Sequence, residues 1–195
     1  MSTAGAIHAL LLDGKGGARA LEWSEVASWK PDDGILWLNL DYTVAEIQDW
    51  LTTRSGLDAV TVSALLDSDP RPRAVANGDH LLLVLRGINN NAGAAPEDMI
   101  SVRAWIEPHR MITLRHRSSS SVSSLREDLR RGSGPRSVGE LALQLVERMV
   151  EHVMMRVDAL GDAVAACEDR VLANDHADLR ATLADHRRRA IALRR

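Results

Sequence analysis

The sequence predicts an α+β protein, in which a domain of strands and short helices is followed by a long helical stalk. Short apolar runs separated by glycine, proline and Asn-Gly turns occupy the chain up to about residue 131. The segment Gly132-Ser133-Gly134-Pro135 has the composition of a linker, and apolar residues recur at helical spacing from there onward. We therefore expect a domain over 1–131, a linker over 132–136 and stalk helices over 137–195.

The first half of the domain is expected to alternate strands with short helices. Residues 6–12 and 18–23 flank the glycine turn 14–17 and predict a strand pair, and the apolar run 34–40 predicts a buried strand. Thr43 and Glu46 have the spacing of a capping box, which predicts a helix through residues 47–51. A second short helix is expected over 57–66, before Pro70 and Pro72 interrupt the chain.

The second half of the domain is expected to consist of hairpins and one helix. Asn77-Gly78 is the strongest hairpin signal and separates residues 74–76 from the apolar run 80–88. Residues 99–107 and 111–117 predict another hairpin, because apolar and polar side chains alternate along the first of these runs. An arginine-bearing helix over 121–131 then leads to the linker.

The stalk is predicted from an apolar seam whose residues alternate spacings of four and three, typical of helices packed lengthwise. Its members are Val146, Val150, Val153, Val157, Leu160, Val164, Cys167 and Val171. A helix of about 35 residues spans roughly 50 Å, whereas a domain of about 130 residues is only about 35 to 40 Å across. The helix must therefore project, and its seam needs a partner.

The last helix is expected to follow a break at Asn174-Asp175 and to run through Leu179, Leu183 and Leu193. It covers only part of the seam, so we expect neighbouring copies of the chain to cover the rest. No glycine, asparagine or proline closes this helix before residue 195. We therefore expect the sequence to be a fragment that stops before a continuation of the same helix.

The composition of the chain excludes several classes of protein. The chain is 45% hydrophobic and 26% charged with a formal charge of −3, which is typical of a soluble globular protein. Arginine clusters are interrupted by acidic residues and lack an aromatic platform, so no nucleic-acid partner is expected. The single cysteine excludes an intramolecular disulfide. The sequence contains neither a signal peptide nor 18 consecutive apolar residues, which predicts a cytoplasmic location for this part.

Motifs for enzyme chemistry are missing from the sequence. It contains no phosphate-binding glycine loop and no HExxH motif. The serines 118–121 are best explained as a helix cap and loop. The residues Asp67, Asp69, Arg71 and Arg73 are best explained as a salt-linked turn. We therefore expect neither enzymatic activity nor a bound cofactor.

The residues that could contact a metal ion lie in the last helix. Asp178, Thr182 and Asp185 form a polar stripe beside the apolar residues, and His186 follows directly. If several copies of this helix surrounded an axis, the stripe would form stacked rings of oxygen atoms, which hydrated divalent cations favour. We name Asp178, Asp185 and His186 as cation-facing candidates, and the alternative interpretation is a solvated helix face.

Three segments together resemble a known family. They are Arg71-Pro72-Arg73, residues 81–89 (LLLVLRGIN) and residues 102–115 (VRAWIEPHRMITLR). In this order they resemble the cytoplasmic domain of the CorA superfamily, closest to its zinc-transporting ZntB branch, and the resemblance covers essentially the whole chain.

The resemblance implies a mixed β-sheet sandwiched by helices (α/β/α), followed by the long helical stalk. It also implies a funnel-shaped homopentamer in the inner membrane, with this part on the cytoplasmic side. The family's two transmembrane helices and its Gly-Met-Asn motif are not in this sequence, so the fragment alone is not expected to conduct ions. The expected function is divalent-cation transport, with zinc as the substrate. The alternatives are a CorA-type magnesium or cobalt channel, and a soluble scaffold that binds partner helices.

Overall fold

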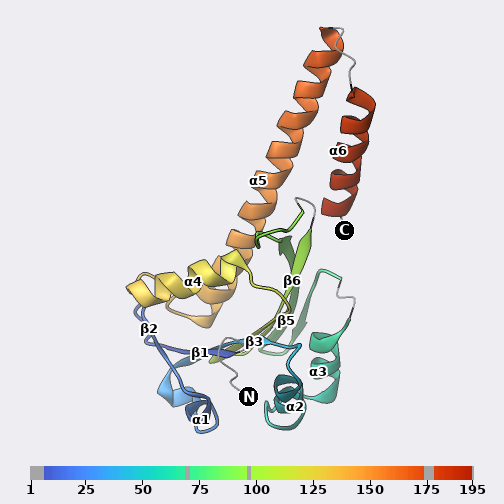
Figure 1. Ribbon diagram of the computed structural model, residues 1–195. Coiled ribbons are helices and arrows are strands. Elements are labelled where there is room, and N and C mark those ends of the chain that lie inside the picture. Colours follow the sequence, from blue (N-terminus) through green and yellow to red (C-terminus); the bar gives the residue numbers. More distant parts are fainter. Residues whose placement is uncertain (1–6, 69–70, 96–97, 174–177, 195) are drawn as a thin grey trace.

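A mixed seven-stranded sheet lies between two layers of helices in the computed structural model, which describes residues 7–68, 71–95, 98–173 and 178–194 (Figure 1). The strand order is β2-β1-β3-β7-β6-β5-β4, and all neighbours are antiparallel except the parallel pair β3–β7. The strands are β1 (Ile7–Leu12), β2 (Ala18–Ala20), β3 (Ile35–Asp41), β4 (Arg73–Asn77), β5 (His80–Ile88), β6 (Met99–Ile106) and β7 (Arg110–Arg115).

The two faces of the sheet carry different helices. One face packs against α1 (Trp23–Val26), α2 (Ala45–Thr53) and α3 (Ala59–Leu66), and the other packs against α4 (Ser120–Arg131) and the start of α5 (Val138–Leu172). A short 3-10 turn covers Pro31–Asp33, and α6 (Leu179–Leu193) lies beside the far part of α5. The α/β/α sandwich with a long C-terminal helix confirms the fold class predicted from the sequence.

Two local predictions in the first half of the domain were wrong. The second strand was expected to reach Trp23, but β2 ends at Ala20 and a one-turn helix begins at Trp23. The carboxylate of Glu25 accepts a 2.7 Å hydrogen bond from the backbone N–H of Glu22, which stabilises that turn. The capping box of Thr43 and Glu46 does not form, because the Thr43 hydroxyl donates instead to Asp41 Oδ1 at 2.7 Å.

Apolar and polar residues alternate along β6, but this strand does not have one buried face and one solvated face. Val102 and Ala104 face α4 and α5, whereas Arg103 and Trp105 face α2 and α3. All four side chains are buried, since helices cover both faces of the sheet. Both layers of helices therefore pack against this inner strand.

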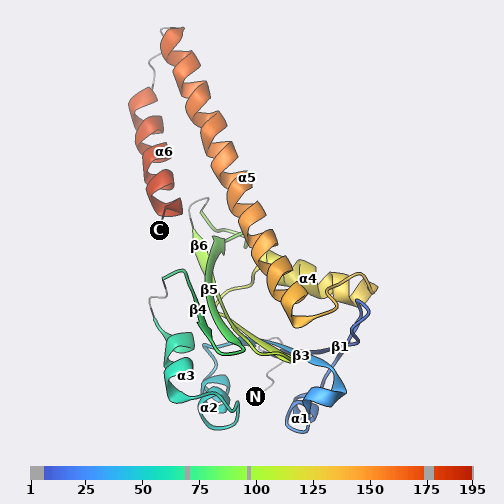
Figure 2. The same cartoon turned by 180° about the vertical axis from the view of Figure 1, so that it is seen from behind.

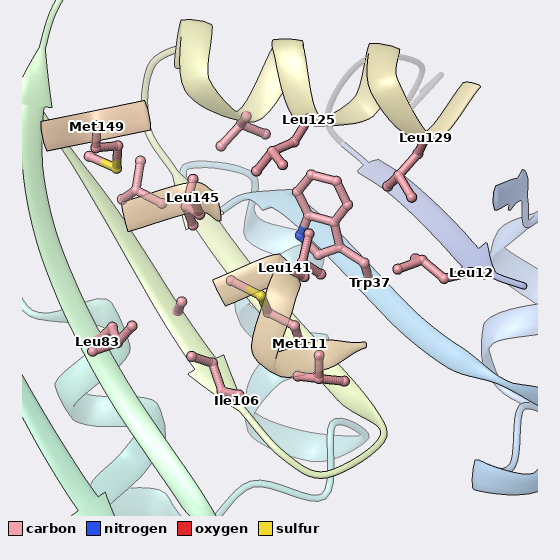
Figure 3. Close-up of a cluster of buried hydrophobic side chains, with 14 residues drawn as sticks. Leu12, Trp37, Leu83, Ile106, Met111, Leu125, Leu129, Leu141, Leu145 and Met149 are labelled. Atoms are coloured by element: carbon pink, nitrogen blue, oxygen red, sulfur yellow. The ribbon is translucent and has the colours of Figure 1, made fainter. Parts of the chain in front are cut away.

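The start of α5 is part of the domain's core. Leu141, Leu145 and Met149 point toward the sheet, beside Trp37 of β3 and Leu125 of α4 (Figure 3). A Cβ atom at Gly87 of β5 would lie 2.7 Å from Met149 Cε, so the glycine provides the space that lets the helix approach the strand.

The segment between α4 and α5 is held against the first hairpin. The backbone N–H of Gly134 donates to the carbonyl of Gly16 at 2.8 Å. Gly16 has a φ of +107°, and a Cβ there would lie 2.8 Å from the Gly132 carbonyl oxygen. The division into a domain (1–131), a linker (132–136) and stalk helices (137–195) stays a prediction. In the structure the first turns of α5 belong to the core of the domain.

Replacing Leu145 by alanine should lower the free energy of unfolding by about 2–5 kcal/mol, because it leaves a cavity between α5 and the sheet. The matched control is Met155→Ala on the same helix, where 67% of the residue is exposed. That change should stay within about 0.5 kcal/mol. Urea unfolding of both variants measures the difference, and equal losses would contradict the packing described for α5.

A histidine lies beneath α4 among arginines. Burial, and then the positive charges of Arg126 and Arg115, lower the pKa of His8 from 6.5 to about 4. Protonation of His8 is therefore unfavourable in the folded protein at pH values where the unfolded chain already binds the proton. This difference in proton binding lowers the free energy of unfolding as the pH falls from about 6.5 to about 4.

We expect the free energy of unfolding to decrease between pH 7 and pH 5, and His8→Gln to make this decrease shallower. The physical reason is that glutamine removes the proton that only the unfolded chain takes up in this range. His109→Gln, in the exposed turn before β7, is the matched control and should keep the wild-type dependence. Identical pH profiles of His8→Gln and the wild type in urea titrations would refute this.

Candidate functional site

The candidate functional site is the stalk formed by α5 and α6. At 1.5 Å per residue, the 35 residues of α5 span about 52 Å, and the helix extends well beyond the sheet (Figures 1 and 2). The helix α6 runs back antiparallel to the far part of α5, and Cys167 and Leu179 are buried near their connection. This confirms that the first stalk helix projects from the domain.

The apolar seam predicted from the sequence is only partly covered within one chain. Cys167 is its single fully buried member among the described residues. Val146, Val153, Leu160 and Val164 are half-buried, and Val150, Val157 and Val171 are exposed. The helix α6 covers the side of α5 that includes Leu160, where Leu193 and Arg189 line a shallow hollow with it. Much of the seam therefore remains accessible to another partner.

An apolar stripe runs along the uncovered side of α5. Its residues are Leu143, Val150, Met154, Val157 and Leu172, and each is between 47% and 81% exposed. Spacings of seven, four and three place the first four members on one side of the helix. Monomeric proteins rarely expose a continuous apolar row of this kind, so the stripe is a candidate contact surface.

An acidic stripe lies next to the apolar stripe and was missed by the sequence analysis. Glu147, Glu151, Asp158, Asp162 and Asp169 are all exposed and follow one another at spacings of four and seven. None of them takes part in an ion pair in the described part of the chain. Like charges four residues apart destabilise a helix slightly. The periodicity that located the seam could have located these carboxylates.

The three residues named from the sequence as cation-facing have different surroundings. Asp178 is exposed at the start of α6 with a φ of 53°, and its carbonyl accepts from the Thr182 hydroxyl at 3.1 Å. The carboxylate of Asp185 is ion-paired with Arg188, and with Arg189 at 2.6 Å. The Nδ1 atom of His186 is buried and has no hydrogen-bond partner in the described part of the chain.

A single chain does not bring these three residues together as a metal site. Within the described ranges, no group of three or more histidine, cysteine, aspartate or glutamate side chains is placed to hold a metal ion. The break expected at Asn174-Asp175 lies outside the described residues. The assignment of Asp178, Asp185 and His186 to a cation path stays a prediction, since it requires several copies of α6.

Among the described residues, none of the helices combines the length and the apolar character needed to cross a bilayer. The long helix α5 carries too many charged residues on its exposed side for that role.

The fold and the stalk match a known family. Residues 32–195 match the family model described as CorA-like Mg²⁺ transporter protein. The chain belongs to this family. The match includes the sheet from β3 onward, all of α5 and the described part of α6, which confirms the resemblance found in the sequence.

Individual relatives agree with this assignment. The chain is 36% identical to the divalent cation transporter CmaX of Pseudomonas aeruginosa, over 98% of its own length and 58% of that protein. It is 31% identical to the zinc transport protein ZntB of Yersinia pseudotuberculosis serotype O:1b, over 97% of its length and 57% of that protein. The crystal structure of the ZntB cytoplasmic domain from Vibrio parahaemolyticus superposes with a TM-score of 0.80 at 23% identity, covering 96% of this chain and 72% of that one.

The chain spans somewhat more than half the length of the curated relatives it matches. The comparisons therefore establish the family and the fold of this portion. They confirm the predicted family and the predicted similarity to ZntB, and they extend the similarity to CmaX.

Proposed function

We propose that this chain is the cytoplasmic part of a divalent-cation transporter of the inner membrane, with zinc as the transported ion. Two relatives of 36% and 31% identity support it, since one is named a divalent cation transporter and the other a zinc transport protein. We further propose that the chain has no enzymatic activity and that the cation is its substrate rather than a bound cofactor.

The observation that carries the proposal is the pair of neighbouring stripes on α5. A projecting helix with one exposed apolar row and one exposed acidic row is suited to assembly around an axis. Burial of the apolar stripe between copies would stabilise the assembly. The acidic stripes would then face a shared vestibule and raise the local concentration of cations there. A homopentamer funnel is the assembly that we propose.

Asp178, Asp185 and His186 are proposed to lie along the path of the cation at the level of α6. Asp178 supports this role best, because its carboxylate is exposed. The paired arginines offset the charge of Asp185, so that its contribution depends on how assembly rearranges Arg188 and Arg189. His186 is a neighbour of that carboxylate.

Magnesium is the second candidate for the transported ion. The matching family model is described by Mg²⁺ transport rather than by zinc. Oxygen ligands, which dominate the acidic stripe, are also those that magnesium prefers. A soluble scaffold without transport is the other alternative, since the apolar stripe alone would also suit a partner helix. Uptake and assembly measurements on the full-length protein separate these possibilities.

Val150→Asp in the full-length protein should weaken self-association, because it places a charge in the centre of the apolar stripe. Val60→Asp on α3 is the matched control, since that valine is 79% exposed and lies outside the stalk. We expect a smaller mean particle mass by light scattering at low protein concentration for Val150→Asp alone. An unchanged mass, or an equal decrease in the control, would contradict assembly through this stripe.

Zinc uptake by the full-length protein in proteoliposomes should decrease severalfold when Asp178→Asn and Asp185→Asn are combined, since two negative charges are removed from the proposed path. Asp49→Asn with Asp79→Asn removes the same charge from exposed positions on α2 and in the β4–β5 turn, and should leave uptake unchanged.

Two results of the uptake assay would count against the proposal. Unchanged zinc flux in the Asp178/Asp185 variant would remove these residues from the mechanism. Magnesium uptake without zinc uptake in the wild type would assign the magnesium function instead.

A further inference from the structure

A pocket rich in arginine lies on the α3 face of the sheet, away from the stalk. Polar side chains next to the buried core line this pocket. Among them, Arg86 of β5 pairs directly with Ser101 of β6. Tyr42 and His116, which follow the last paired residues of β3 and β7, continue the lining across the sheet. Ser68, Asp98 and Arg117 also line the pocket.

Arg103 provides a buried positive charge in this pocket. Only 1% of the residue is exposed. One terminal nitrogen donates to the Leu65 carbonyl at 2.6 Å, the other donates to the Tyr42 hydroxyl at 3.3 Å, and the guanidinium lies 4.4 Å from the centre of the Tyr42 ring. Its Nε atom is buried and has no hydrogen-bond partner in the described part of the chain. Burial lowers the pKa of Arg103, and the neighbouring Tyr42 and Asp67 oppose this shift.

Arg86, which is half-buried, lies two residue pairs farther along the sheet. Its Nε atom is also buried without a hydrogen-bond partner, and no ion pair joins it to a described carboxylate. Asp98 is the one carboxylate among the described residues of the pocket lining, and its Oδ2 atom already accepts from the Ala95 backbone at 3.1 Å. Three arginines therefore line the pocket beside one carboxylate that is already engaged, while Asp67 acts on Arg103 from outside the described lining. Buried donors of this kind are rare in native proteins and point to a missing acceptor.

We propose that this pocket binds a phosphate group, with Arg86, Arg103 and Arg117 as its positive contacts. Guanidinium groups bind phosphate oxygens through short, charge-assisted hydrogen bonds, and the two unpartnered Nε–H groups are donors of the required type. The hydroxyls of Ser68 and Ser101 lie on the same lining and can donate further hydrogen bonds.

The size of the pocket favours a phosphate ester over the free ion. Its volume of about 370 Å³ is within the range of small-molecule sites. Inorganic phosphate would fill only part of that space. The shared chemistry of the two ligands is the phosphate group, and the test distinguishes them by comparing inorganic phosphate with a phosphomonoester, glycerol 3-phosphate.

The test is calorimetric titration of the chain with each probe in metal-free buffer. We expect saturable binding, weakened about tenfold or more by Arg86→Gln, which removes one charged donor and keeps much of the side chain's length. Arg117→Gln, at an exposed position, should weaken binding without affecting folding. Arg54→Gln removes an exposed arginine that directly follows α2 and is not in the described pocket lining, so it is the matched control that should bind as the wild type.

Each outcome decides the proposal. Binding that Arg86→Gln and Arg117→Gln weaken and Arg54→Gln does not supports it, and tighter binding of glycerol 3-phosphate than of inorganic phosphate identifies an ester as the ligand class. Equal affinities identify the free ion instead. No saturable heat up to about 10 mM of either probe overturns the proposal, as does equal weakening by all three variants. The result is independent of transport, because it is measured on this chain alone.

Discussion

The packing of α5 against the sheet is the constraint on which the rest of the structure depends. A single helix serves two environments, since Leu141, Leu145 and Met149 complete the core and the residues beyond them extend away from it. Arg148 strengthens this attachment by contacting α4 twice, through Asp128 at 2.5 Å and Ser124 at 2.8 Å. Because a helix is stiff over this length, the direction of the stalk is set by contacts within its first four turns.

Local signals in the sequence predicted most of the helices and strands. Contacts between distant segments could not be predicted from such signals. Turns marked by Asn77-Gly78 and Pro108-His109 identified both hairpins, because their backbone requirements are local. The one-turn helix at Trp23 was missed, since four residues are too few to show a helical period. Val138, Leu141 and Leu145 lie on a different side of α5 from Val150 and Val157, and which side meets the sheet depends on docking.

Less of the candidate site could be predicted, because it also depends on contacts between distant segments. The stalk itself followed from the spacing of its apolar residues, and the acidic stripe could have been found with the same periodicity. The pairing of Asp185 with Arg188 and Arg189 is also a local feature at spacings of three and four. The arginine pocket is different, because Arg86 and Arg103 become neighbours only through the register of β5 and β6.

The arginine pocket and the attachment of the stalk meet on one strand. Arg86 points to the pocket on the α3 face, and the next residue, Gly87, lies against Met149 of α5 on the opposite face. A Cβ atom at Gly87 would already be only 2.7 Å from Met149 Cε, so the backbone of β5 has little space to move toward the helix. Any rearrangement of Arg86 that shifts this backbone must therefore be accommodated by α5 or by the neighbouring strand. Because Met149 is buried in the same cluster as Leu141 and Leu145, a shift of this kind would change the packing that holds the first turns of α5 against the sheet.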